Sequence, residues 1–234
     1  PMLDVRQLCA WYGKAQILFD VSLNVGAGEC VALMGRNGAG KSTTMKAIMG
    51  LLARRSGRVS FEGRDISAQA SHSISQLGMG WVPEDRRIFT DLSVRENLEV
   101  GRQPPRAGAP TWTIDKLTAL FPNLATMLDR PGGRTSGGEQ QMLTIARTLM
   151  GNPQLILLDE PSEGVAPLIV EQLAQMMVSL KAQGLSILLS EQNIHFARLV
   201  SDRAVVLEKG QVQFTGTIEE LMANDMVQRT YLSV

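Results

Sequence analysis

The residues between Gly35 and Thr43 have the types and spacing of a phosphate-binding loop. The stretch GRNGAGKST places glycines at positions 35, 38 and 40 ahead of a lysine and a serine. Without side chains at these positions, the backbone can wrap a phosphate chain and aim N–H groups and a helix N-terminus at its charge. Lys41 would add a cation against the β- and γ-phosphates, and Ser42 a hydroxyl ligand for Mg²⁺. The pattern predicts a nucleotide site with magnesium.

The sequence on either side of this loop supports the same interpretation. An apolar run, CVALM, precedes it and a helix-like segment, KSTTMKAIMGLL, follows it. The alternative is a glycine-rich turn that only joins a strand to a helix, but the lysine-serine pair and the strand-helix context both favour phosphate binding. The residues expected to contact ATP here are Gly35, Arg36, Asn37, Gly38, Ala39, Gly40, Lys41, Ser42 and Thr43.

Two carboxylates follow a second buried strand. The run LILLDE at 155–160 ends in Asp159 and Glu160, at the strand end where α/β folds place their ligands. Asp159 can hold Mg²⁺, and Glu160 can orient or deprotonate a water that attacks the γ-phosphate in line. Many strands end in acids for structural reasons alone. The combination with the phosphate loop is what favours catalysis.

A third polar segment begins a helix. Ser136, Gly137, Gly138 and Glu139 precede an apolar helical pattern, and Ser-x-x-Glu at this place is a helix capping box. Two glycines and a serine at a helix N-terminus also leave N–H groups and a hydroxyl available to an outside anion. Both roles are compatible in the same four residues.

The order of apolar runs predicts an α/β fold. After Gln154 short apolar strands alternate with helices, which is typical of a mostly parallel, buried sheet. The first sixty residues are rich in strands, and a proline- and glycine-rich stretch at 102–111 indicates an exposed loop. Expected strands cover 3–12, 18–25, 29–35, 58–63, 78–84, 155–160, 185–192, 204–210 and 211–216. Expected helices cover 41–52, 93–101, 113–121, 123–129, 140–151, 165–184 and 193–202, with a closing helix and tail at 217–234.

Charge and hydropathy exclude some classes of partner. Lysine plus arginine equal aspartate plus glutamate at 23 each, so overall charge does not favour nucleic acid or an anionic membrane. The apolar runs are far shorter than the ~18 residues that a membrane span needs. We therefore expect no nucleic-acid partner.

The four motifs, in this order, resemble the ATPase domain of ABC transporters over essentially the whole chain. They are the phosphate loop, the SGGEQ segment, the apolar-Asp-Glu run and the following Pro161-Ser162 turn. The resemblance implies a P-loop NTPase of the ABC ATPase type, with a mostly parallel sheet core, N-terminal antiparallel strands and an inserted helical subdomain. We accordingly expect one domain over 1–234, its helical subdomain at about 86–152 and its nucleotide-binding core at 1–85 and 153–234.

The resemblance also implies an activity and an assembly. It implies ATP hydrolysis coupled to transport, in a head-to-tail dimer whose SGGE segment from one subunit covers the γ-phosphate held by the other. Tyr12 matches the aromatic residue that stacks on adenine, the alternative being a half-buried aromatic at a strand end. The turn at 162–164 matches the one that touches the opposite site.

Two positions depart from the general ABC pattern. Glu84 stands where most members have a glutamine that senses Mg²⁺ and the membrane partner, and Gln192 stands where most have a switch histidine. Gln192 can hydrogen-bond a phosphate oxygen but cannot act as an acid or base near neutral pH. The structural alternatives are a surface acid paired with Arg86 or Arg87, and a polar residue that ends a strand.

These departures and their surroundings sharpen the resemblance. PEDRRIF, SGGEQQML, EPSEGVAP and LLSEQN together are similar to the second ATPase of bacterial branched-chain, or hydrophobic, amino-acid uptake systems. This implies two membrane-spanning permease subunits, a second ATPase subunit, identical or paralogous, and indirectly an external solute-binding protein. It also implies a location on the cytoplasmic face of the bacterial inner membrane, peripheral through the permease. Glu84 would join Ser42 and Asp159 at the metal, and Gln192 would act with Glu160 in catalysis.

Three other functions stay open. Importers of urea, amides or aromatic acids use similar ATPases. An ABC-type ATPase acting on nucleic acid or ribosomes is disfavoured by the zero net charge and the absence of tandem cassettes. A nucleotide-binding switch with weak hydrolysis is motivated by Glu84 and Gln192, but Lys41, Ser42 and Asp159 argue for turnover.

Overall fold

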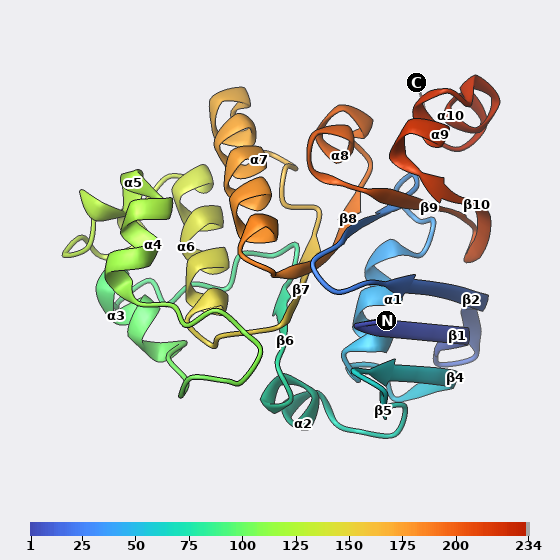
Figure 1. Cartoon of the computed structure of the whole chain (residues 1–234), viewed down its shortest axis with the longest axis horizontal. Coiled ribbons are helices and arrows are strands. Elements are labelled where there is room, and N and C mark those ends of the chain that lie inside the picture. Colours follow the sequence, from blue (N-terminus) through green and yellow to red (C-terminus); the bar gives the residue numbers. More distant parts are fainter. Residues whose placement is uncertain (233–234) are drawn as a thin grey trace.

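A parallel sheet and an antiparallel sheet enclose one helix between them (Figure 1). The computed structural model describes residues 1–232. The strands are β1 Leu3–Tyr12, β2 Ala15–Val25, β3 Cys30–Met34, β4 Arg54–Phe61, β5 Arg64–Asp65, β6 Met79–Val82, β7 Leu155–Asp159, β8 Ser186–Glu191, β9 Arg203–Glu208 and β10 Gln211–Thr217. The α-helices are α1 Lys41–Ile48, α2 Ser71–Gln76, α3 Val94–Val100, α4 Ile114–Leu120, α5 Pro122–Ala125, α6 Gly137–Leu149, α7 Pro167–Ala182, α8 Ile194–Val200, α9 Ile218–Met222 and α10 Asp225–Tyr231.

The larger sheet has the strand order β10-β9-β3-β8-β7-β6 and is parallel except for the β9–β10 pair. Its central strands β3, β7 and β8 are buried on both faces, which explains their continuous apolar sequences. Parallel pairing brings the carboxyl ends of β3, β7 and β8 to one edge. The phosphate loop, Asp159 and the end of β8 therefore lie beside one another.

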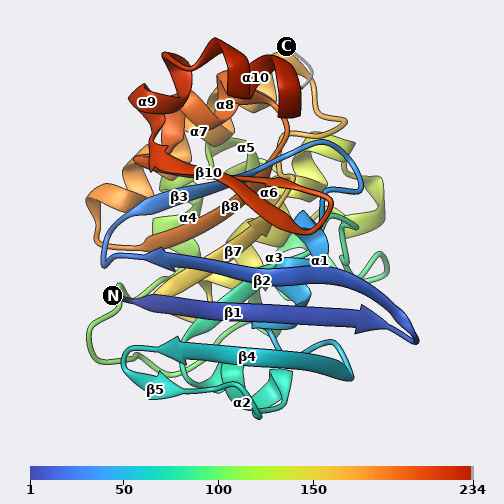
Figure 2. The same ribbon diagram turned by 90° about the vertical axis from the view of Figure 1, so that its right-hand side faces the viewer.

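The smaller sheet, β2-β1-β4-β5, is antiparallel and crosses over the α1 side of the larger one (Figure 2). One core lies between the two sheets and contains α1 together with Leu155, Leu157 and Leu188. The residues that alternate with these, Ile156 and Leu158, face a second core with α6 and α7. Helices α8, α9 and α10 pack over the β3–β9 end of that same face.

Several predicted boundaries were wrong, for identifiable reasons. The strand expected at 58–63 begins at Arg54, because antiparallel pairing with β1 extends through the polar residues 54–57. The strand expected at 18–25 begins at Ala15, which pairs with Tyr12 across a tight turn. The closing helix is two helices, because Asn224 caps a new helix that begins at Asp225, its side chain accepting a hydrogen bond from the N–H of Val227. The last residues of that predicted tail, 233–234, lie outside the described residues.

Helices α3, α4, α5 and α6 form a group beyond β6, at the opposite end of the molecule from the antiparallel sheet (Figure 1). Their apolar residues share the core of α7 rather than that of α1. The proline-rich stretch at 102–111 contains no helix or strand. The division into a core and an inserted helical subdomain stays a proposal. No helix within residues 1–232 combines the length and apolar character needed to span a membrane.

Candidate functional site

The phosphate loop runs from the end of β3 into α1 with a backbone that requires glycine. Gly38 and Gly40 have φ values of 85° and 110°. A Cβ on Gly35 would lie 2.6 Å from the Leu207 carbonyl oxygen. Helix α1 has no side-chain cap and no acidic residue in its first turn. Its N-terminus is therefore open to an anion, whereas side chains cap the N-termini of α3, α6 and α8.

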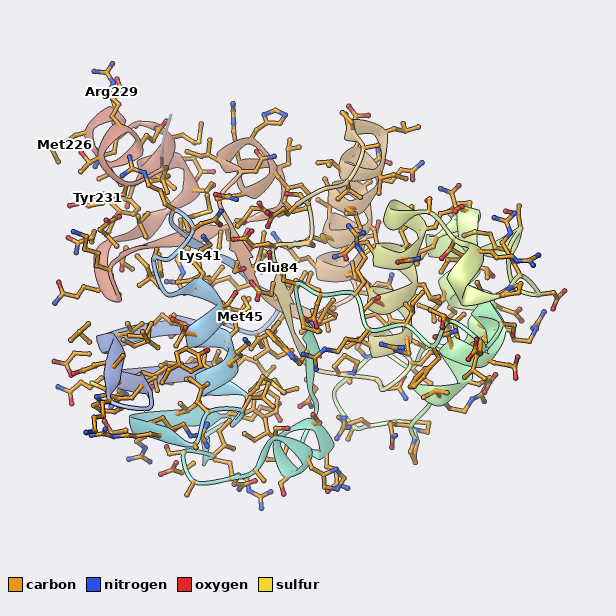
Figure 3. The ribbon with its side chains drawn as sticks, turned by 180° about the vertical axis from the view of Figure 1, so that it is seen from behind. Lys41, Met45, Glu84, Met226, Arg229 and Tyr231 are labelled. Atoms are coloured by element: carbon orange, nitrogen blue, oxygen red, sulfur yellow. The ribbon has the colours of Figure 1, made fainter. Side chains whose placement is uncertain are left out.

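Lys41 is the cation of this loop and is almost completely buried, at 4% exposure. Its Nζ donates hydrogen bonds to the carbonyl oxygens of Gly35 and Arg36 and lies 3.1 Å from Glu160 Oε1. Figure 3 shows Lys41 in the middle of the molecule, close to the labelled Glu84. The ammonium group of Lys41 and the carboxylate of Glu160, the predicted catalytic base, are therefore in direct contact.

Ser42, Asp159 and Ser190 form a hydrogen-bonded row beside Lys41. Ser42 Oγ donates to Asp159 Oδ2 at 2.7 Å, and Ser190 Oγ donates to Asp159 Oδ1 at 2.5 Å. The hydroxyl and carboxylate predicted to bind a metal therefore face each other. Both are oxygen ligands of the kind that Mg²⁺ prefers.

Glu160 occupies an unusual backbone conformation just beyond β7. Its φ is +46°, in a region that non-glycine residues seldom adopt. Its N–H donates to Ser190 Oγ at 3.0 Å, which fixes the peptide against β8. Oε2 is buried and accepts no hydrogen bond from the described residues. One oxygen of the predicted base is therefore without a donor in the folded chain.

Glu84 and Glu163 bring two further carboxylates to Glu160. Ligand oxygens of the three residues lie within 4.8 Å of one another. A hydrogen bond with Glu160, burial and the charge of Glu160, together with a smaller contribution from Glu84, raise the pKa of Glu163 to about 8. A protonated Glu163 would supply the donor that Glu160 Oε2 otherwise lacks. Arg87 forms an ion pair with Asp85 and not with Glu84. The predicted alternative in which Glu84 pairs with Arg87 at the surface is therefore wrong.

The SGGE segment begins α6, which packs in a different core from α1, the helix that follows the phosphate loop. Ser136 Oγ accepts from Glu139 N, and Glu139 Oε1 accepts from Ser136 N, which confirms the predicted capping box. Gly138 packs against α7, since a Cβ there would lie 2.8 Å from Ile169 Cγ1. Helix α6 faces the core of α7, and α1 faces the other core. Ser136 and Gly137 remain exposed at the surface.

Comparison with known proteins identifies the family. Residues 18–163 match the ABC transporter family. The chain is an ABC transporter ATPase. It is 41% identical over 231 residues, 99% of each chain, to the high-affinity branched-chain amino acid transport ATP-binding protein BraG of Pseudomonas aeruginosa. It is 35% identical over 233 residues, 99% of this chain and 97% of the other, to the lipopolysaccharide export system ATP-binding protein LptB of Haemophilus influenzae.

A solved structure supports the same assignment. The ADP conformation of MJ1267, an ATP-binding cassette of an ABC transporter, matches with a TM-score of 0.81 at 27% identity, covering 97% of both chains. The predicted ABC ATPase fold, with its antiparallel N-terminal sheet and parallel core, is confirmed. Members of this family bind nucleotide, and ATP hydrolysis coupled to transport is their general activity.

Two further predicted site residues of this ABC ATPase, Tyr12 and Gln192, lie at or just beyond the end of a strand. Tyr12 ends β1 and is 46% exposed, which is compatible both with an adenine contact and with the predicted alternative of a half-buried aromatic at a strand end. Gln192 follows β8 directly, and its N–H donates to Glu191 Oε1 at 3.2 Å. The contacts of Tyr12 with adenine and of Gln192 with phosphate stay predictions.

The sequence reasoning overlooked Ser190 and Glu191. Ser190 supports Asp159 and Glu160, while Glu191 accepts from Ser162 Oγ at 2.8 Å. The signal was present in LLSEQN, because polar residues at the carboxyl end of a central parallel strand face the same edge as Asp159. In this segment only Gln192 was predicted as a site residue, and not the two residues before it.

Proposed function

We propose that this ABC ATPase powers uptake of branched-chain or related amino acids across the bacterial inner membrane. The observation that carries the catalytic part is the contact of Lys41 and Ser42 with Glu160 and Asp159. The full-length 41% identity to a branched-chain amino acid transport protein supports the solute class. Two permease subunits, a second ATPase subunit and, indirectly, an external solute-binding protein are the proposed partners. Attachment to the permease would hold the chain at the cytoplasmic face.

Nucleotide and metal both fit the donors that this chain presents. The uncapped N-terminus of α1 suits a phosphate, and Lys41 would exchange the loop carbonyls and Glu160 for phosphate oxygens. Ser42 and Asp159 would hold Mg²⁺, with Glu84 nearby, and the ion would offset charge on the phosphates. The segment from Gly35 to Thr43 and the Tyr12 ring would bind the rest of ATP.

Glu160 would act as the base. Its burial and the hydrogen bond from its N–H to Ser190 Oγ keep its position defined, and a water between Glu160 and the γ-phosphate would be oriented for in-line attack. Gln192, fixed through its backbone at the end of β8, would hydrogen-bond the γ-phosphate. Ser136, Gly137, Gly138 and Glu139 of a second ATPase subunit would cover the phosphate from the other side.

Replacement of Glu160 by glutamine tests the catalytic assignment. Magnesium-dependent turnover should fall at least about a hundredfold in Glu160→Gln, because general-base catalysis contributes that much or more, while ATP affinity is retained. Glu171→Gln, on the exposed side of α7, makes the same chemical change away from the site and should leave turnover unaltered. Phosphate release and ATP titration calorimetry measure the two quantities. Wild-type turnover in Glu160→Gln would refute the role of Glu160.

The same measurements separate hydrolysis from the switch alternative. ATP binding by the wild-type chain without turnover, even with its membrane partners, would favour a nucleotide-binding switch in which Glu84 and Gln192 have replaced the usual groups. The buried Lys41–Glu160 pair argues for hydrolysis, because both groups are held in place at the cost of removing two charges from water.

Lipopolysaccharide export is a second candidate, favoured by the similarity to LptB over 99% of the chain. Purification from native membranes, followed by identification of the accompanying permease and binding protein, separates export from import. ATP-dependent accumulation of labelled leucine in vesicles that contain the purified complex would support amino-acid uptake. Urea, amide and aromatic-acid substrates in the same vesicles test the related importers.

A further inference from the structure

A buried carboxylate lies at the end of β8, next to the phosphate loop. Glu191 is 1% exposed and pairs in the sheet with Met34, the residue that precedes Gly35. None of the ion pairs within the described residues involves it. Burial raises its pKa, and the charge of Glu160 contributes in the same direction. A buried acid without a cation is costly, so a purely structural position would suit an apolar residue better.

Both oxygens of Glu191 are hydrogen-bonded, and they join two different segments. Oε2 accepts from Ser162 Oγ at 2.8 Å, in the turn after Glu160. Oε1 accepts from the N–H groups of Gln192 and Asn193 at 3.2 and 3.1 Å. One side chain therefore ties the turn at 161–164 to the backbone of Gln192.

The two segments have different proposed tasks. The turn containing Ser162 would face the nucleotide held by the second ATPase subunit, and Gln192 would face the nucleotide of its own chain. Asn193 caps α8, so the backbone of Gln192 is held between a strand end and a helix start. A displacement of the turn would therefore reach the backbone of Gln192 through the buried side chain of Glu191.

We propose that Glu191 is a positioning residue that couples the turn at Ser162 to Gln192, so that contact with the second subunit sets the position of Gln192 against the γ-phosphate. This inference rests on the proposed function. It adds Glu191, and the hydrogen bonds that Glu191 accepts, as a connection between the two nucleotide sites. Glu191 itself touches neither nucleotide nor water in this scheme.

Two substitutions separate coupling from simple packing. Glu191→Gln keeps every contact, because its amide oxygen accepts the two N–H groups and its amide nitrogen donates to a reversed Ser162 hydroxyl. Glu191→Met fills similar space but removes all three hydrogen bonds. We expect kcat to fall about ten- to a hundredfold in Glu191→Met, with KM for ATP changed less than about twofold, and to stay within about threefold of wild type in Glu191→Gln.

Ser162→Ala should be non-additive with Glu191→Met, because the two residues act as a unit. Ser186→Ala, at the opposite end of the same strand, is the matched control and should leave kcat unchanged. Hydrogen exchange gives a readout that needs no turnover. Ser162→Ala should speed exchange of the Gln192 and Asn193 amides, and Glu191→Met should speed it both there and in the turn.

The outcomes distinguish the two levels of the proposal. An inactive wild-type chain would count against the proposed function, and the exchange measurements would still decide the link between Ser162 and Gln192. With an active wild type, unchanged kcat in Glu191→Met, or additive losses in the double variant, would overturn the positioning role. Equal losses in Glu191→Gln and Glu191→Met would also overturn it, because the glutamine variant preserves the contacts.

Discussion

At the scale of single residues, the site is a set of charges and hydroxyls that depend on one another. Lys41 pairs with one oxygen of Glu160, Ser190 accepts a hydrogen bond from the peptide N–H of Glu160, and Glu160 raises the pKa of Glu163. Because these groups are in contact, a change in the charge of any one of them affects its neighbours.

The raised pKa of Glu163 makes its interaction with Glu160 measurable as a change of stability with pH. Its pKa lies at about 8 in the folded chain against an ordinary 4.5, so the folded state binds this proton more tightly than the unfolded state. The resulting stabilisation is complete below about pH 4.5 and is lost as pH rises through about 8. Glu163→Gln should remove this part of the decline, an effect below about 1 kcal/mol because Glu163 is exposed and solvent screens it.

Urea unfolding of both chains between pH 5 and 8, at constant ionic strength, measures the difference. Glu191 has a raised pKa as well and is present in both chains, so its contribution cancels in the comparison. Parallel stability curves for wild type and Glu163→Gln would contradict the shared proton. A wild-type curve that declines more steeply than that of the variant is the expected result.

At the scale of elements, the start of α6 packs tightly against α7 at Gly138. A Cβ on Gly138 would lie 2.8 and 3.1 Å from two carbons of Ile169 and 3.3 Å from Val165, so Gly138→Ala forces these helices apart. We expect a loss of about 1–3 kcal/mol in the free energy of unfolding, as overpacking generally causes. Urea denaturation provides the measurement.

Gly137→Ala is the matched control in the same helical turn. Its Cβ would meet only the end of the flexible Arg86 side chain, at 2.9 Å from Nη1, which can move away. Alanine also favours helix over glycine by roughly 0.5–1 kcal/mol, so this variant should be neutral or more stable. Equal destabilisation of both variants would show that packing against α7 does not distinguish the two glycines.

The elements that were predicted correctly from the sequence are those whose structure is determined by neighbouring residues. The capping box at Ser136 and the apolar strands β3, β7 and β8 follow from neighbouring residues and appear as expected. The start of β4 at Arg54 was missed, because its polar residues become a strand only by pairing with β1. Tertiary pairing decided that boundary.

The same distinction applies to the site. Phosphate-loop spacing and the Asp159–Glu160 pair predicted four residues that the fold brings together. The hydrogen bonds of Glu191 with Ser162 and of Ser190 with Asp159 join segments about 30 residues apart. No local pattern specifies such contacts. They require the parallel register that places the ends of β7 and β8 side by side.

At the scale of the whole molecule, the two segments predicted to bind phosphate lie at the starts of helices in different cores. Helix α1, which follows the phosphate loop, packs in the core shared with the antiparallel sheet, and the SGGE segment begins α6 in the other core. Ser136 and Gly137 are exposed rather than covered by their own chain. A complete site of the proposed kind therefore needs a phosphate loop from one subunit and an SGGE segment from another.

Mixing two inactive variants tests this shared site. Lys41→Ala removes the phosphate-loop cation and Ser136→Arg blocks the SGGE segment, so a dimer of either variant with itself has two defective sites. A mixed dimer has one intact site, which joins Lys41 of the Ser136→Arg chain to Ser136 of the Lys41→Ala chain. Random pairing makes half of the dimers mixed, so ATPase activity should recover to about one quarter of wild type if the sites act independently. Each variant alone, measured at the same total concentration, is the control. A mixture no more active than its two inactive components would overturn the shared site, and wild-type activity in Ser136→Arg alone would show that hydrolysis does not need the SGGE segment of a partner.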